Sequence, residues 1–240
     1  FGNFQARLLE TGHVRLRGKE IGVFTDLATG RILQHWRNPY TGETVEVFNF
    51  RNDRVRGELG TTMPVFSMGD AEDAPTLMNE GSTQRQADGQ VPFILPWERF
   101  GDATLLSWDY THRYRNPVSP DRWPRASTGP YINPSEHFTF NTTHAELEDR
   151  SNPCARFHSG FTRLSPCWPW MRMGREYGEV LLFGRMHSHK QGRGHEDIPR
   201  QLLDWAEINC PEYLEPCEDW DDGAPLSTWE SYAREVPPEE

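Results

Sequence analysis

The sequence predicts a mainly β protein: one antiparallel, calycin-like β-barrel over residues 1–240, with one outer C-terminal helix. Three observations lead to this prediction. The 20 Gly and 19 Pro imply many turns between short elements, as all-β folds require. The 13 Phe and 9 Trp imply an interior built from rings rather than from aliphatic chains. Several segments alternate apolar and polar residues with the period of two that is typical of half-buried strands.

Two matching turn segments give the clearest local signal. Asp26–Gly30 and Asn38–Gly42 each begin with Asp or Asn and end with Thr-Gly, as a type I turn closed by a left-handed glycine requires. They separate apolar runs at 21–25, 32–36 and 44–50. The sequence therefore predicts a three-strand antiparallel meander in this region.

Residues 51–96 contain much Gly, Pro, Asp, Ser and Gln, with only short apolar pieces. A long polar stretch of this kind within a compact domain is commonly functional, so we expect either a lid or a plain surface loop. The strands that follow are predicted from their alternation at 104–114, 137–144, 154–164 and 179–189.

One outer helix is predicted from Asp197, which can cap it, to about Ile208. Pro199 suits its first turn. A stripe along one face of this helix consists of Ile198, Leu202, Trp205 and Ala206. A shorter second helix is predicted near 228–234.

The cysteines and one sequon favour an oxidising, secretory environment. Asn141-Thr142-Thr143 is a glycosylation sequon, and a glycan on Asn141 would point to solvent and direct Phe138 and Phe140 inward. Four cysteines allow three pairings, and no spacing among them fits a zinc site. The simplest pairing predicts two local disulfides, Cys154/Cys167 and Cys210/Cys217.

Net charge, hydropathy and missing motifs argue against several classes of partner and cofactor. A net charge of −11 argues against nucleic acid, because phosphate contacts need clustered Lys and Arg. No apolar run approaches the length of a membrane span. The chain contains no G-x-S-x-G, G-x-G-x-x-G or P-loop motif, and no cofactor is predicted.

A metal site is not predicted, although His187 and His189 could share a strand face. The glycine and glutamate spacings around them differ from those of a cupin metal motif. A metal-dependent oxygenase or isomerase therefore stays an alternative rather than the main prediction.

Residues 167–174 hold two Trp, two Met and one Arg, which indicates either a lined pocket or a corner of the core. If Arg172 is buried, its guanidinium needs an acceptor, either a carboxylate such as that of Asp109 or a substrate anion. We expect Arg172, Tyr110 and His158 to act on the substrate. The side chains expected to bind it are Trp97, Phe100, Trp108, Phe138, Phe140, Trp168, Trp170 and Met171.

Several motifs together resemble the family catalogued as domain of unknown function 1838. They are Phe24–Gly30, Trp36–Val47, Trp168–Gly174, Asp197–Pro199 and Cys210–Leu214. The resemblance spans most of the chain except about residues 55–100. Bacterial members of that family often carry export signals, which agrees with the secretory interpretation. In size and composition the chain is also similar to the small β-barrel hetero-Diels–Alder catalysts of fungal tropolone sesquiterpenoid biosynthesis, although no catalytic motif matches.

These observations predict a cofactor-independent lyase or cyclase of secondary metabolism that acts on an apolar, oxygenated small molecule. The reaction would be a dehydration or a hetero-Diels–Alder type of cycloaddition. Hydrogen bonds from the polar trio would activate an oxygen, and the rings would hold the partners together. A lipocalin-like carrier without chemistry is the first alternative, and a homo-oligomer is compatible with the sequence.

Overall fold

A computed structural model describes residues 1–59, 65–67, 78–79, 97–111, 114–149, 151, 157–174, 181–189, 195, 198–216 and 226–239. Only the backbone is described at residues 16, 54–59, 65–67, 78–79, 97, 108, 110–111, 114 and 181–189. Most of the predicted lid at 51–96 lies outside these ranges.

The described residues form mostly strands, with a few short helices. The strands are β1 (Gly2–Leu8), β2 (Val14–Gly22), β3 (His35–Arg37), β4 (Thr44–Glu46), β5 (Phe50–Leu59), β6 (Val65–Ser67), β7 (Met78–Asn79), β8 (Trp97–Phe100), β9 (Ala103–Thr111), β10 (Tyr114–Arg115), β11 (Tyr131–Ile132), β12 (Ser135–Thr143), β13 (His158–Pro166) and β14 (Leu181–His189). The helices are α1 (His144–Glu148), α2 (Arg200–Asn209) and α3 (Thr228–Glu235), with the short 3-10 helices η2 (Pro169–Met171) and η3 (Pro211–Tyr213).

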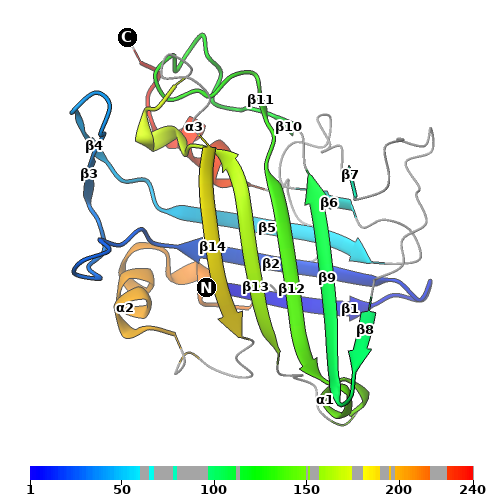
Figure 1. The fold of residues 1–240 in the computed structure, drawn as a ribbon. Helices are drawn as coiled ribbons and strands as arrows, with labels where there is room; N and C mark the ends of the chain where they lie inside the picture. Colours follow the sequence, from blue (N-terminus) through cyan, green and yellow to red (C-terminus); the bar gives the residue numbers. More distant parts are fainter. Residues whose placement is uncertain are drawn as a thin grey trace.

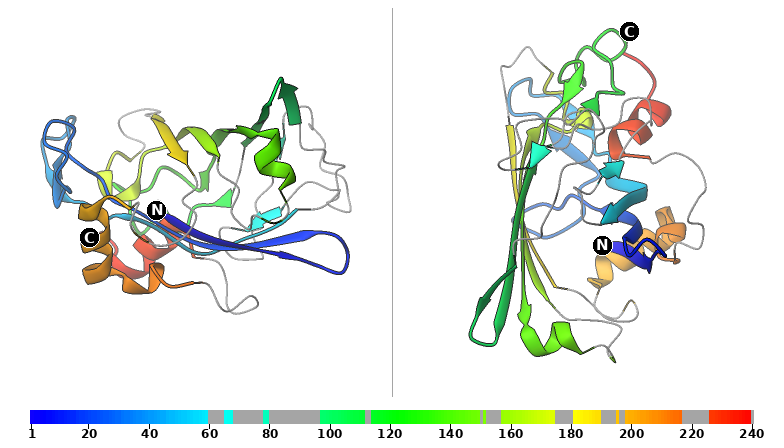
Figure 2. Two further views of the ribbon diagram at one scale, coloured as in Figure 1. Left: turned by 90° about the horizontal axis from the view of Figure 1, so that it is seen from below. Right: turned by 90° about the vertical axis from the view of Figure 1, so that its right-hand side faces the viewer.

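Two antiparallel sheets form the body of the protein, and their strands cross at a steep angle (Figure 1). One sheet has the order β1-β2-β5-β6. The other has the order β14-β13-β12-β9-β7, with β8 paired to β9. Figure 2 shows the sheets as two layers, with α2 and α3 on the side of the first sheet that faces away from the second.

The mainly antiparallel β prediction is therefore confirmed, and the second sheet is strongly curled. No strand pairing joins the two sheets among the described strands, so that part of the chain does not show a closed barrel. The crossing of the two layers still leaves one face of each sheet directed at the other. These inner faces hold the site described below.

The predicted strands at 104–114, 137–144, 154–164 and 179–189 correspond to β9, β12, β13 and β14 with shifted ends. Both predicted helices are present as α2 and α3. Leu203 and Ala206 of α2 are buried beside Ile21 of β2. Ser227 caps α3, because its side chain accepts from the Glu230 backbone N–H while Glu230 accepts from that of Ser227.

Both predicted turns are present, and each closes on a glycine in the left-handed region, Gly30 at φ 69° and Gly42 at φ 73°. The Asp26 carboxylate accepts from the Thr29 backbone N–H at 2.8 Å. The Asn38 side-chain oxygen accepts from the backbone N–H of Tyr40 at 2.8 Å. This confirms the turn chemistry that the sequence predicts.

The predicted meander forms only in part. Strands β3 and β4 pair as a hairpin through Trp36 and Val45. The first turn, in contrast, joins its flanking residues by a single isolated bridge between Thr25 and Ile32. Beside this turn, Phe24 packs into an aromatic core, which Phe50 at the start of β5 also contacts.

That aromatic core lies where the hairpin, η2 and α3 meet. Trp168 stacks at a tilt on Trp229, with 4.3 Å between ring centroids, and Phe24 contacts Trp170 edge-on. The buried members of this cluster are Val45, Val118, Trp123, Ala126, Ile132, Trp168, Trp170, Trp229 and Tyr232. The prediction of an interior built from rings is confirmed for this part of the protein.

The predicted disulfide of Cys210 is absent, since its thiol is free in the structure. Cys210 is buried behind α2, where it packs as a small apolar side chain, and burial raises the pKa of its thiol to about 11. Cys167 is also buried, and no disulfide occurs among the described residues. Cys154 and Cys217 lie outside those residues. Asn141 is exposed on β12, as the sequon requires, and its glycosylation stays a prediction.

The buried turn residue Asn38 gives a first test of this account. Besides closing its turn, Asn38 donates from its amide to the Met171 carbonyl at 3.0 Å, so its removal would orphan buried groups on two segments. Asn38→Ala is expected to lower the free energy of unfolding by about 2 kcal/mol. Asp26→Ala, in the matching turn at the surface, is expected to cost less. Urea unfolding of both variants measures the difference, and equal losses would contradict the account.

Candidate functional site

A buried ion pair lies on the inner face of the second sheet. Glu136 in β12 and Arg163 in β13 are register partners, and their side chains are 8% and 11% exposed. Arg163 Nε lies 3.3 Å from Glu136 Oε1. Charges this deeply buried are rare unless they are paired, and the pair is costly to bury even then.

Two tryptophans flank the guanidinium of Arg163. Its carbon lies 5.4 Å from the ring centroid of Trp168 and 5.7 Å from that of Trp229. Both distances fit a cation–π contact. The Arg163 charge is thus held between the aromatic core and Glu136.

The hydrogen bonds of Arg163 are incomplete. Both Nε and Nη2 are buried and have no hydrogen-bond partner within the part of the chain that the structure describes. The contact of Nε with Glu136 is an ion pair without hydrogen-bond geometry. Buried donors are nearly always satisfied, so these two donors are an unusual feature of the interior.

A second carboxyl group reaches the same interior from the first sheet. Glu20 in β2 is the register partner of Asn52 in β5, and the Asn52 amide donates to Glu20 Oε2 at 3.0 Å. The Asn52 side-chain oxygen in turn accepts from the Thr228 backbone N–H at 3.0 Å. This chain of bonds fixes the position of the Glu20 carboxyl from the start of α3.

Burial raises the pKa of the Glu20 carboxyl, and the negative charge of Glu136 raises it further. The Asn52 hydrogen bond and the positive charge of Arg163 act in the opposite direction but do not offset burial. The charges of both Glu136 and Arg163 shift the pKa of Glu20, so the three groups form one electrostatic cluster across the two sheets. We call Glu20, Glu136 and Arg163 the inter-sheet charge cluster.

Aromatic rings continue the inner face beyond Glu136. Phe138 and Phe140 follow it at alternate positions of β12, with their rings parallel and 6.2 Å apart. Phe161 lies 4.7 Å from Phe138 on the neighbouring strand, and Phe157 meets Phe140 edge-on. All four residues are only half-buried, so solvent reaches this stripe of rings. A flat apolar molecule could stack there beside the charges.

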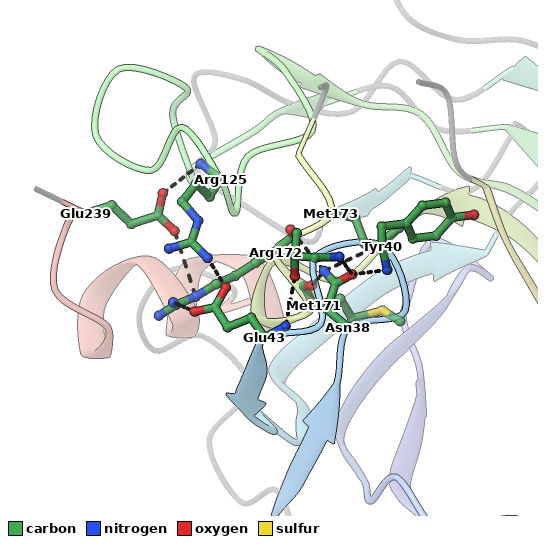
Figure 3. A network of polar contacts seen from close by, with 9 residues as sticks. Asn38, Tyr40, Glu43, Arg125, Met171, Arg172, Met173 and Glu239 are labelled. Atoms are coloured by element: carbon green, nitrogen blue, oxygen red, sulfur yellow. Dashed lines mark hydrogen bonds and ion pairs between the residues drawn. The ribbon is translucent and has the colours of Figure 1, made fainter. Parts of the chain in front are cut away.

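Arg172 lies outside the charge cluster, in a network of its own (Figure 3). It follows η2 in the left-handed region at φ 49° and donates to Glu43 Oε1 at 2.8 Å. Arg125 also pairs with Glu43, and Glu239 accepts from the Arg125 backbone N–H at 2.6 Å. The predicted acceptor Asp109 is instead bonded to His137. The network ties the C-terminal segment to the β3–β4 hairpin.

The tryptophan run at 167–174 serves the core on one side and the charge cluster on the other. Trp168 is buried and contacts Arg163, as described above. Trp170 is buried among Phe24 and Trp36, and Met171 packs partly buried against the same core. Of the three residues predicted to bind substrate, only Trp168 touches the charge cluster.

The other predicted residues are scattered over the second sheet. Tyr110 and Trp108 in β9 are the register partners of Glu136 and Phe138, which places their backbone at the cluster, while their side chains lie outside the description. Trp97 pairs with Leu106, and again only its backbone is described.

His158 and Phe100 are both exposed. His158 begins β13, five residues before Arg163. Phe100 pairs with Ala103, whose partner Thr143 lies seven residues along β12 from Glu136. The structure therefore does not bring Arg172, Tyr110 and His158 together as one trio.

No group of three or more potential metal ligands occurs among the residues that the structure describes. His187 and His189 lie on β14 opposite Gly160 and His158, and their side chains are outside the description. Within the described ranges, every helix is too short or too polar to span a membrane.

Comparison with known proteins gives one family. A family model described as "Protein of unknown function (DUF1838)" matches residues 3–236, nearly the whole chain. The chain belongs to this family. The resemblance drawn from its turn, tryptophan and helix motifs is thus confirmed, and residues 55–100 fall within the match as well. No curated protein and no solved structure matches the chain.

The charge cluster of this DUF1838 protein was missed because the sequence contains many acidic residues with no distinctive spacing. A usable signal was nevertheless present. Glu136 alternates with Phe138 and Phe140, and Arg163 alternates with Phe161, so the period of two that directs the rings inward also directs these charges inward. A charged residue on the apolar face of a predicted strand marks such a site.

The raised pKa of Glu20 predicts a pH-dependent change in stability. The unfolded chain carries Glu20 with an ordinary pKa of about 4.3, so between that value and the raised one the native state binds more protons. The contribution of Glu20 to the free energy of unfolding therefore falls as pH rises. Glu20→Gln removes this loss, and its stability relative to the unchanged protein is expected to increase from about pH 5 to about pH 8.

Urea unfolding at both pH values measures this change. Glu46→Gln, at an exposed position of β4, is the matched control and should show no such trend. A stability difference for Glu20→Gln that does not vary with pH would contradict the raised pKa.

Proposed function

We propose that this protein is an enzyme that eliminates water from a small, largely apolar, oxygenated molecule bound between the two sheets. The sheets would be the halves of a calycin-like barrel, with the ring stripe and the charge cluster on its inner side. Elimination of water is redox-neutral, so its balance requires no cofactor. The reaction class is a lyase, as the sequence predicts.

The observation that carries the proposal is a pair of carboxyl groups in unequal environments. Burial favours the neutral form of Glu20, whereas Glu136 is paired as a carboxylate with Arg163. Two carboxyls whose environments separate their protonation states supply one acid and one base. Glu20 is therefore the proton donor and Glu136 the proton acceptor.

In the proposed step, Glu136 removes a proton from carbon as Glu20 gives its proton to the departing hydroxyl group. The carbon–oxygen bond breaks, a carbon–carbon double bond forms, and water leaves. Glu136 then holds the proton that Glu20 has lost. Because the two carboxyls influence each other electrostatically, a proton passed between them directly or through water restores the starting state.

The aromatic surroundings support a flat, apolar substrate. Trp168 and Trp229 cover the guanidinium on one side, and the half-buried rings of Phe138 and Phe161 extend from the ion pair. Held in this space, a newly formed conjugated product could meet a second reactive group at short range, which is the requirement of the predicted cycloaddition. Proximity would supply most of the gain in that second step.

A carrier without chemistry would use the same rings but would not need an acid and a base. A panel of aryl-substituted alcohols, half of them β-hydroxyketones with the carbonyl carbon two carbons from the hydroxyl-bearing carbon, separates the two functions. Loss of water from these alcohols gives conjugated products that absorb at longer wavelength. The proposal predicts turnover of at least some members by the unchanged protein.

Replacing either carboxyl is expected to reduce that turnover strongly. Glu20→Gln and Glu136→Gln should each lower kcat by about 10²-fold or more, because each removes a proton transfer from the reaction. Initial rates of absorbance change provide the measurement. Glu98→Gln, at an exposed position of β8, is the control and should retain activity.

Glu136→Gln also leaves Arg163 without its partner, so its fold must be checked by circular dichroism. Glu136→Asp keeps the charge but shortens the side chain, and partial activity in this variant would support a role as base. Turnover within tenfold of the unchanged protein in both glutamine variants would contradict the proposal. Binding of the alcohols without any product would favour the carrier.

A further inference from the structure

The unpartnered donors of Arg163 point to the chemical class of the substrate. We infer that the molecule bound between the sheets carries a ketone or aldehyde oxygen that accepts a hydrogen bond from Arg163, with the departing hydroxyl group on the β carbon. The substrate class is thus a β-hydroxycarbonyl compound attached to a flat apolar body. This inference rests on the proposed elimination and adds the group that makes it feasible.

The present arrangement of Arg163 is costly. Arg163 is 11% exposed, and its Nε and Nη2 lack hydrogen-bond partners among the described residues. A buried donor without a partner costs free energy that a folded protein rarely leaves unrecovered. Each of the two nitrogens has almost no accessible surface in this structure, so an oxygen acceptor on the ligand would complete these donors only as the surrounding side chains move to admit it.

The surroundings of Arg163 also restrict the charge of that acceptor. The positive charge of Arg163 is already balanced by Glu136, and burial together with the charge of Glu136 disfavours a further negative charge at Glu20. A second fixed anion, such as a carboxylate or a phosphate, would be placed beside Glu136 and repelled by it. A neutral carbonyl oxygen avoids this repulsion and still accepts the hydrogen bond. The surroundings therefore favour a carbonyl group.

A carbonyl group next to the reacting carbon also makes the elimination easier. A proton on carbon next to a carbonyl is far more acidic than one on an ordinary alkyl carbon. When Glu136 removes it, the electron pair of the carbon–hydrogen bond forms a double bond to the carbonyl carbon, the π pair of the carbonyl moves to its oxygen, and Arg163 stabilises the negative charge that forms there. The oxygen then re-forms the carbonyl double bond, the enolate double bond shifts to lie between the α and β carbons, and the β hydroxyl leaves with the proton of Glu20. The products are an α,β-unsaturated carbonyl compound and water.

The rings next to the cluster define the remainder of the molecule. Phe138 and Phe161 are tilted against each other at 4.7 Å and are both half-buried, so they offer exposed apolar surface adjacent to the ion pair. An aryl or polyene group attached beyond the hydroxyl carbon would cover this surface. The charge cluster would then bind one end of the ligand, and the rings of Phe138 and Phe161 would bind the other.

Binding of two matched compounds that cannot react tests the inference. Acetylnaphthalene and ethylnaphthalene share ring and shape, and differ by a carbonyl in place of a methylene group. Isothermal titration gives the ratio of their dissociation constants for the unchanged protein and for Arg163→Met. Comparing ratios removes the difference in hydrophobicity between the compounds. We expect Arg163→Met to lower the preference for acetylnaphthalene by at least about tenfold, the effect of one charge-assisted hydrogen bond.

Two further variants keep the test decisive. Arg163→Met with Glu136→Gln removes both charges together, and it replaces the single variant if that one does not fold. Arg51→Met removes an arginine that pairs with Glu235 rather than with the cluster, and its ratio should equal that of the unchanged protein. Failure of both compounds to bind, or a ratio that does not depend on Arg163, would overturn the inference.

The outcomes separate this inference from the proposed function. A carbonyl preference that depends on Arg163, without dehydration of any alcohol, would support the carbonyl-bearing ligand class and contradict the proposed enzymatic function. Dehydration that depends on Glu20 and Glu136, without any carbonyl preference, would support the enzymatic function and contradict the ligand class.

Discussion

The ion pair between Glu136 and Arg163 is the constraint on which the interior of this protein depends. Arg163 joins β13 to β12 through Glu136, and its guanidinium lies against Trp168 and Trp229 of the aromatic core. Burying such a pair contributes little net stability compared with apolar residues of similar size. An interior that is otherwise rich in rings therefore gains little stability from these charges. Their presence agrees with the catalytic roles that we propose for them.

Glu20 completes the cluster around the same pair. Burial drives its carboxyl toward the neutral form, and the negative charge of Glu136 adds to this effect. Asn52 and Thr228 hold Glu20 in place, so α3, the first sheet and the second sheet all contribute to one site. The crossing of the two sheets is what brings residues so far apart in the chain together.

Much of the fold could be predicted from local sequence, but only part of the site could. The turn at Asn38–Gly42 and the strand around Phe138 depend on neighbouring residues, and both form as predicted. The alternation along β12 and β13 directs Glu136 and Arg163 inward, but their meeting with Glu20 depends on the way two sheets cross, which no local pattern encodes. Arg172 is an example of a misleading local pattern. Its aromatic neighbours in the sequence favoured a pocket, but its guanidinium donates to Glu43 at the β3–β4 hairpin. The prediction of a disulfide at Cys210 was wrong, because the spacing of cysteines does not reveal which of them fill apolar space.

The protonation state of Glu20 at neutral pH tests the central claim most directly. Carbon-13 NMR of protein labelled at the glutamate side-chain carboxyl carbon follows the titration of each glutamate. One glutamate is expected to titrate above the ordinary value of about 4.3, and its signal should be missing from Glu20→Gln. If every glutamate titrated in the ordinary range, Glu20 would be an ordinary carboxylate, and the assignment of an acid and a base between the sheets would be wrong.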